Sequence, residues 1–252
     1  MASRWEQQRD IERRRRRIEK LAFTQFRRTG KEIFASVLED LGKYRLLGKV
    51  GAADLKRFQL DYRNSLELVV DRSAKAAITI EVANHGDALS KLQISRLPPS
   101  KEIARKYMKR YGLRRINGIM KTQRAVMNHI IQQNITAGEV AIAEALQERM
   151  PGIIFNQARV VARTETGRAL NSSQVEVGKD ISKVTGRIML KIWVANQGER
   201  TREAHANADG QTVQIDSPFM VGGEQIQYPG DGSAANSINC RCTIAQQLSK
   251  KK

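Results

Sequence analysis

The sequence predicts an α+β fold, in which a mostly helical N-terminal two-thirds is followed by a small α+β C-terminal unit with a β-hairpin. Between residues 18 and 65, apolar side chains recur at spacings of three and four, which is the period of helices that bury one face. Residues 188–194 alternate instead, as a half-buried strand does. Gly222 and Gly223 separate two short runs that read as strands, and paired glycines supply the positive φ of a tight hairpin turn.

The helical part is expected to continue to about residue 182. Residues 66–97 include a short alternating run, but their alanine-rich surroundings favour a helix, which we predict there. Pro98 and Pro99 break the chain, and Ser100 is predicted to cap the next helix. After Gly118 we expect a further helix, and the spacing of Thr136 and Glu139 predicts a capping box for the one that follows.

A second break is predicted at Pro151-Gly152, before a helix that contains residues 158–171. Short helices joined in this way are typical of a bundle. We therefore divide the chain into four regions. They are an N-terminal basic helical region (1–97), a central helical region (98–182), a C-terminal α+β unit (183–247) and a basic tail (248–252).

Composition limits the class of protein. The 252 residues carry a formal net charge of +18, and the pI is near 10.3, which favours an anionic partner. Two cysteines in this length imply no disulfide framework. No signal-peptide core and no apolar run of membrane-spanning length is found, so we expect a soluble protein that uses no cleaved signal and contacts no membrane during assembly.

The positive charge is concentrated in two clusters. Residues 1–28 hold ten Arg or Lys and four acids, and residues 101–124 hold nine and one. Five successive arginines occupy every face of a helix. We therefore expect this segment either to stay in solvent, as a helix or disordered, or to bind an anion. The side chains predicted to bind the phosphates of double-stranded DNA are Arg13, Arg14, Arg15, Arg16, Arg17, Lys101, Arg105, Lys106, Lys109, Arg110, Arg114 and Arg115.

The C-terminal unit contains a candidate metal site. Cys240 and Cys242 lie one residue apart and are poorly spaced to bridge each other, but their thiolates could hold Zn²⁺ together with His205 and a carboxylate of Asp209 or Asp231. The alternative is that both cysteines are reduced, packed thiols. A catalytic cysteine is disfavoured, because His205 has no identifiable orienting partner.

Two blocks of sequence resemble a known family. Trp193, Arg202, His205, Gly210 and Phe219, followed by Y-P-G-D at 228–231 and N-C-R-C at 239–242, are similar to the C-terminal signature of the phage Mu protein F-like minor head proteins, the phage head morphogenesis family. The run A-R-V-V-A-R-T-E-T at 158–166 resembles a helix of the same family. Together the two blocks cover about residues 130–245.

The resemblance implies a minor capsid protein of a tailed bacteriophage or prophage. Such a protein is incorporated during head assembly in the host cytoplasm and stays in the virion, in the head interior or near the portal. The implied partners are the portal protein, capsid or scaffold proteins and packaged DNA. The residues to which we assign a structural or interaction role are Arg163, Glu165, Trp193, Arg202, His205, Phe219, Pro229, Asp231 and Arg241.

Arg163 and Glu165 lie two positions apart, so they do not share a helix face and cannot pair with each other. We expect them to face the C-terminal unit and to orient it through charge-assisted hydrogen bonds. Ordinary surface contacts are the alternative.

The rival function is an enzyme, either a metal-dependent nuclease or a toxin-type transferase that uses the C-terminal unit. No phosphate-binding glycine loop and no nucleophile elbow occurs in the sequence. We therefore predict a protein that is not an enzyme.

Overall fold

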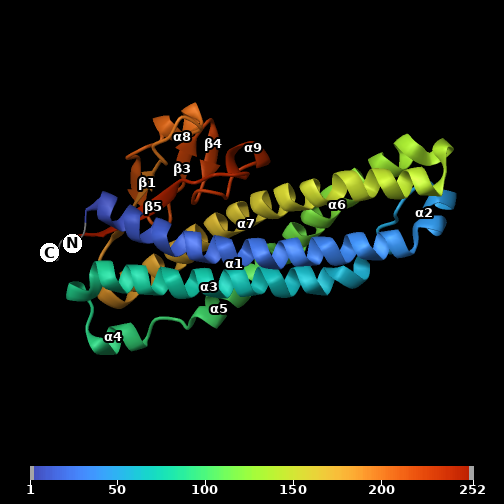
Figure 1. Ribbon diagram of the computed structural model, residues 1–252. Coiled ribbons are helices and arrows are strands. Elements are labelled where there is room, and N and C mark those ends of the chain that lie inside the picture. Colours follow the sequence, from blue (N-terminus) through green and yellow to red (C-terminus); the bar gives the residue numbers. More distant parts are fainter. Residues whose placement is uncertain (1–2, 250–252) are drawn as a thin grey trace.

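A computed structural model describes residues 3–249 of the protein. Long helices lie side by side over most of the molecule, and a small unit of short strands and helices packs against them at the end where both termini lie (Figure 1). The helices are α1 (Arg4–Glu39), α2 (Leu41–Leu47), α3 (Gln59–His85), α4 (Lys91–Ser95), α5 (Ser100–Tyr107), α6 (Leu113–Asn134), α7 (Glu139–Thr185), α8 (Glu203–Asn207) and α9 (Ala234–Ser237). The α+β class with a helical N-terminal two-thirds is confirmed.

The bundle core forms because the apolar positions of α1, α3 and α7 fall on facing stripes. On α1, Ile11, Ile18, Ala22 and Phe26 are buried, at spacings of seven, four and four residues, while their neighbours are exposed or half-buried. The helices of regions 1–97 and 98–182 share this core, since α1 and α3 both pack along α7. None of the helices within residues 3–249 is both long enough and apolar enough to cross a membrane.

Helix α7 runs through the predicted break at Pro151-Gly152, so that prediction was wrong. Pro151 and Gly152 are exposed, and the buried residues Met150 and Ile154 lie on either side of them. Because the proline is on the solvent side, water can satisfy the carbonyl that its missing N–H leaves free, and burial of the opposite face keeps the helix continuous.

The two predicted caps were also wrong. Ser100 is the first residue of α5 rather than its cap, and its hydroxyl donates to Asp71 Oδ1 at 2.8 Å. At the start of α7 the cap is Gly138, with φ of 98° and no side-chain cap hydrogen bond, so Thr136 and Glu139 form no capping box. Gly118, expected before a helix, lies exposed inside α6, which joins α5 through a π-helical turn at Met108–Gly112.

The C-terminal unit contains two small antiparallel sheets. Its strands are β1 (Met189–Val194), β2 (Thr212–Gln214), β3 (Phe219–Val221), β4 (Glu224–Ile226) and β5 (Thr243–Leu248). β1 lies between β2 and β5, and β3 pairs with β4 as the predicted hairpin. Gly222 and Gly223 have φ of 57° and 79°, which is the conformation that a type I′ turn requires at both positions. Within the predicted basic tail, residues 250–252 lie outside the described residues.

A chain of buried polar side chains joins this unit to three helices of the bundle. Gln246 of β5 exchanges hydrogen bonds with Gln7 of α1, at 3.1 and 3.2 Å. Its side-chain amide donates to the carbonyl of Gln174 on α7 at 2.7 Å. Gln174 in turn donates to Glu81 on α3 at 2.9 Å. Buried polar groups need such partners, so these bonds fix how the sheet sits on the bundle.

Candidate functional site

The middle of α7 is enclosed on every side. The eight residues from Thr164 to Asn171 are all buried, whereas a surface helix would expose about half of them. The bundle covers one side of this segment, and the loops before and after α9 cover the other. This part of α7 and the loops around α9 belong to the two blocks of sequence that carry the family resemblance. The structure therefore brings the two blocks together.

Neutral hydrogen bonds fix the position of the C-terminal loops on this segment. Asn171 Nδ2 donates to the carbonyls of Pro229 and Cys242, at 3.0 and 3.2 Å, and Asn171 Oδ1 accepts from the hydroxyl of Thr243 at 3.1 Å. The backbone N–H of Asn239 donates to the hydroxyl of Thr164 at 3.1 Å. Asn171 alone therefore links the loop before α9 to the start of β5.

A buried ion pair lies beside these bonds. Arg168 donates to a carboxylate oxygen of Glu165 and, through Nε, to the carbonyl of Gly230 at 2.6 Å. Burial opposes the charge of Arg168, but the neighbouring Glu165 prevails and raises the pKa of the guanidinium. The sequence pointed to Glu165 but not to Arg168. The two residues are three positions apart on one helix, and this spacing could have predicted the ion pair.

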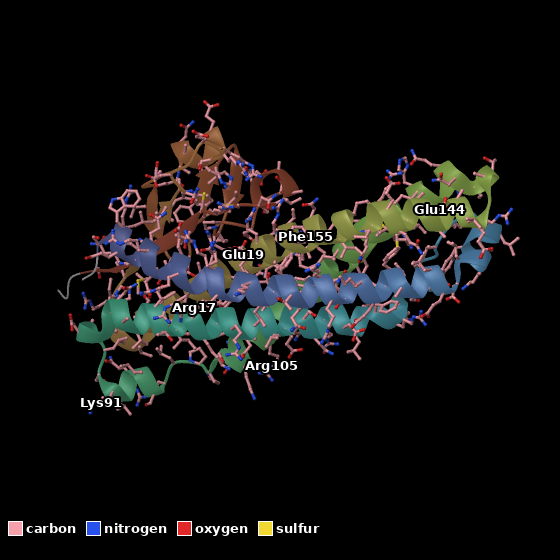
Figure 2. The ribbon with its side chains drawn as sticks, in the orientation of Figure 1. Arg17, Glu19, Lys91, Arg105, Glu144 and Phe155 are labelled. Carbon is pink, nitrogen blue, oxygen red and sulfur yellow. The ribbon has the colours of Figure 1, made fainter. Side chains whose placement is uncertain are left out.

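Arg163 connects three parts of the molecule. Its Nε lies 3.2 Å from Glu19 Oε1 on α1, and its Nη1 donates to Asn239 Oδ1 at 3.3 Å. Figure 2 shows Glu19 on the part of α1 that lies below the C-terminal unit. Arg163 thus contacts the C-terminal unit directly, and Glu165 acts on it through Arg168.

Arg15 does not stay solvated as the other arginines of its run do. It is 6% exposed and donates to the carbonyl of Arg241 at 2.8 Å. The expectation that this whole turn meets solvent or an anion was therefore wrong for Arg15, because the C-terminal unit covers that face of α1. Arg13, Arg16 and Arg17 remain exposed, but Arg13 and Arg14 both pair with Asp10, and Arg16 lies 3.7 Å from Glu12.

The same junction contains a basic cavity of about 480 Å³ between α1, α7 and the loop before β5. Arg15, Arg159, Arg163 and Arg241 contribute to its walls. Burial and then the nearby Arg163 lower the pKa of Arg241. Six basic side chains and two carboxylates, Glu12 and Glu19, line the cavity, so its lining carries a net positive charge.

The second basic cluster is on the surface. Lys101, Arg105, Lys109, Arg110 and Arg114, which we name the basic ridge, are all exposed along α5, the π turn and the start of α6. Within the described part of the chain no carboxylate pairs with them, whereas Lys106 lies 3.0 Å from Glu102 and Arg115 is half-buried. In Figure 2, Arg105 lies at the edge of the bundle away from the C-terminal unit.

His205, Cys240 and Cys242 form one buried cluster. They are 2%, 7% and 3% exposed, and their ligand atoms all lie within 4.8 Å of one another. His205 Nδ1 is 3.6 Å from Cys240 Sγ and 3.4 Å from Cys242 Sγ. A hydrogen bond from Cys242 lowers the pKa of Cys240 against the effect of burial, and the same contact and burial raise the pKa of Cys242.

Asp231 is not a member of this cluster, so its prediction as a metal ligand was wrong. Its Oδ2 instead accepts from the backbone N–H of Gln227 at 3.3 Å. Asp209 is outside the cluster too, because it binds Arg4 at 2.9 Å and the N–H of Ala195 at 2.9 Å. The carboxylate of Asp231 therefore stabilises a turn, and that of Asp209 pairs with Arg4.

Aromatic rings enclose the cluster. Trp193 is 1% exposed and makes edge-on contacts with His205 and Phe219, at centroid distances of 5.5 and 5.4 Å. Arg202, at the cap of α8, donates to the carbonyl of Ile238 at 2.6 Å. Packing and the hydrogen bond from Arg202 therefore help to hold α8, which carries His205, against the loop that precedes the cysteines.

Lys191 is a buried residue that the sequence reasoning did not select. It is fully buried beside Phe219, and its ammonium donates to the carbonyl and side-chain oxygens of Gln227, at 2.7 and 3.1 Å. Burial, with a smaller effect of Lys179, lowers its pKa to about 8. Lys191 alternates with Met189 and Trp193, which face inward, and this alternation could have predicted that Lys191 is buried.

The lowered pKa of Lys191 predicts a pH-dependent stability. In the unfolded chain the lysine keeps its proton to about pH 10.4, so between about pH 8 and 10 the unfolded state binds more protons than the folded state. Stability should therefore rise with pH in this window relative to Lys191→Met. Urea unfolding of both proteins from pH 7 to 9.5 measures the difference, and parallel curves would show that Lys191 does not titrate there.

Comparison with known proteins identifies related sequences for the C-terminal half. Residues 124–245 match the family described as "Phage Mu protein F like protein". The minor head protein GP7 of Bacillus phage SPP1 is 30% identical over 134 residues, which are 50% of this chain and 42% of that protein. An NAD(+)--arginine ADP-ribosyltransferase EFV of Enterococcus faecalis is 36% identical over 93 residues, 36% of this chain and 19% of that protein. The chain thus spans less than half of the length of either relative, and no solved structure gives a significant match.

Proposed function

We propose that the protein is a minor head protein of a tailed bacteriophage or prophage, because residues 124–245 match the family described as "Phage Mu protein F like protein". It would enter the head during assembly in the host cytoplasm and remain in the virion near the portal. The match to this family is the observation that carries the proposal. The minor head protein GP7 of Bacillus phage SPP1 is similar to half of this chain.

The geometry of the C-terminal unit supports a structural role. Its signature residues are used to join the unit to α7, through the carbonyls of Pro229, Gly230 and Cys242. A unit held this firmly presents a fixed outer surface to other proteins. Residues 199–242 hold six acids and three basic residues, so this surface differs in charge from the basic helices. We assign the unit to contacts with the portal and with capsid or scaffold proteins.

The exposed basic side chains support contact with packaged DNA. Five exposed cations on one continuous stretch of helix can neutralise phosphates without reading sequence. The exposed residues Arg13, Arg16 and Arg17 of α1 offer a second set. Arg15 is excluded from it, since the carbonyl of Arg241 is its partner.

Replacing the basic ridge with glutamine should weaken binding to double-stranded DNA and flatten its salt dependence. Each lost phosphate contact reduces the slope of log affinity against log salt by about 0.9. Fluorescence anisotropy with a random-sequence duplex at several salt concentrations measures both quantities. The variant also removes no buried group, so its melting temperature should be unchanged.

A charge-matched control separates local contacts from net charge. Lys31, Arg45, Lys49, Lys56 and Arg63 are also exposed, and their replacement by glutamine removes the same total charge. The control should keep most of the slope. Equal losses in the two variants would assign DNA binding to overall charge, and an unchanged slope in the ridge variant would contradict the assignment of the ridge.

The similarity to an ADP-ribosyltransferase raises an enzymatic function as the second candidate. Most of that relative lies outside the match, and the His205, Cys240 and Cys242 cluster of this chain is buried. A buried cluster offers no pocket for a protein or nucleic-acid substrate. We therefore favour the structural role.

A further inference from the structure

The cluster of His205, Cys240 and Cys242 has the geometry of a metal site rather than that of a hydrogen-bonded triad. One nitrogen lone pair can accept one hydrogen bond well, yet both sulfurs point at His205 Nδ1, at 3.6 and 3.4 Å. A cation bound by all three atoms uses every one of these contacts at once. Nitrogen and thiolate sulfur are the donors that Zn²⁺ takes in proteins.

The distances agree with a zinc tetrahedron. With Zn–S of about 2.3 Å, Zn–N of about 2.0–2.1 Å and a tetrahedral angle, the S···N edge is about 3.6 Å long. The two observed separations are 3.6 and 3.4 Å, so the ion would fit with little movement of the side chains. The two sulfurs lie within the same 4.8 Å group.

The other ring nitrogen of His205 is held as in a metal-bound histidine. Nε2 lies 3.3 Å from Asn236 Oδ1, a hydrogen-bond acceptor. A proton on Nε2 leaves the lone pair on Nδ1, which faces the two thiols. Ligating histidines commonly donate their second N–H to a carbonyl or carboxylate in this way. Trp193 packs against the ring and restricts its rotation.

The three ligands also come from separate parts of the unit. His205 is on α8, and both cysteines lie just before β5. The unit has two sheets of short strands, and its two cysteines are free. We propose that His205, Cys240 and Cys242 bind one Zn²⁺, which links α8 to the chain before β5, and that Asn236 positions the imidazole.

The first test is the metal content of the full chain. Protein purified without chelator or added metal should contain about one equivalent of zinc, because binding at such a site contributes directly to folding. Removal of zinc with a chelator should lower the melting temperature, and addition of Zn²⁺ should restore it. Cobalt(II) added to the stripped protein should give thiolate charge-transfer absorption.

Two variants locate the ion. Cys240→Ser with Cys242→Ser should bind less than about 0.1 equivalent of zinc and give no cobalt–thiolate band. His129→Gln changes an exposed histidine and should behave as the wild type. If the cysteine variant does not fold, the stripping and restoration of the wild type still decide the question.

Two results would overturn the proposal. One is wild-type protein with less than about 0.1 equivalent of zinc, no response to chelator and no cobalt–thiolate band, which would make the cysteines packed thiols. The other is a folded cysteine variant that retains its zinc, which would place the ion elsewhere.

Discussion

Replacement of Arg168 by methionine should lower the free energy of unfolding by about 3–5 kcal/mol. Arg168 and Glu165 are 4% and 5% exposed, so the change leaves a buried carboxylate without its partner. It also removes the donor to the carbonyl of Gly230. A buried charge without a partner costs more than the same pair contributes when intact, and urea unfolding measures the difference.

Two further variants test the cause of this loss. Arg163→Met removes a partly exposed ion pair with Glu19 from the same helix and should cost only about 0–1 kcal/mol. The double change of Arg168 and Glu165 to Met and Leu should recover much of the stability, since no buried charge remains. A loss below about 1 kcal/mol in Arg168→Met would show that the pair does not hold the loop on α7.

Trp193→Ala should cost about 3–5 kcal/mol and affect the C-terminal unit first. The side chain is 1% exposed, contacts Phe219 and His205, and lies opposite Ile244 in the sheet. Its removal leaves a cavity that the two small sheets cannot close. Thermal unfolding followed by circular dichroism measures the loss.

The second tryptophan of the chain is the matched control. Trp5 is 41% exposed and makes one contact of cation–π type, with Arg4. Trp5→Ala should change stability by no more than about 1 kcal/mol. Similar losses in the two variants would contradict the central position of Trp193 in the unit.

Local features of the C-terminal unit could be predicted from the sequence. The hairpin follows from Gly222 and Gly223, because few other residues adopt their φ values, and the strand at 189–194 follows from its alternation. The helix expected over 66–97 is present as far as His85. Each of these depends on neighbours in the chain.

Features that depend on distant segments could not be predicted. Pro151 reads as a break, but burial of Met150 and Ile154 by other helices keeps α7 continuous. From the sequence, Arg15 is expected to be a solvated cation, but in the structure it donates to the carbonyl of Arg241 in the C-terminal unit. Asp231 is predicted to be a metal ligand, but its carboxylate accepts a hydrogen bond from the backbone N–H of Gln227 within the same turn.

The candidate site shows the same division. Spacing and residue type indicated that His205, Cys240 and Cys242 belong together, and the structure brings them within 4.8 Å. The partners of Asn171 could not have been predicted, because they are two carbonyls from loops 58 and 71 residues away. Lys191 required knowledge of which face of β1 is buried.

The central claim is that the protein is a structural component of the head. It is tested most directly by quantitative mass spectrometry of purified, DNA-filled heads of a phage that encodes this chain. The wild type should be present at a fixed, low ratio to the portal protein, and Arg168→Met should be depleted in proportion to its lost stability. Heads that lack the wild-type chain, together with purified protein that transfers ADP-ribose from NAD to arginine, would contradict the claim and favour the enzyme.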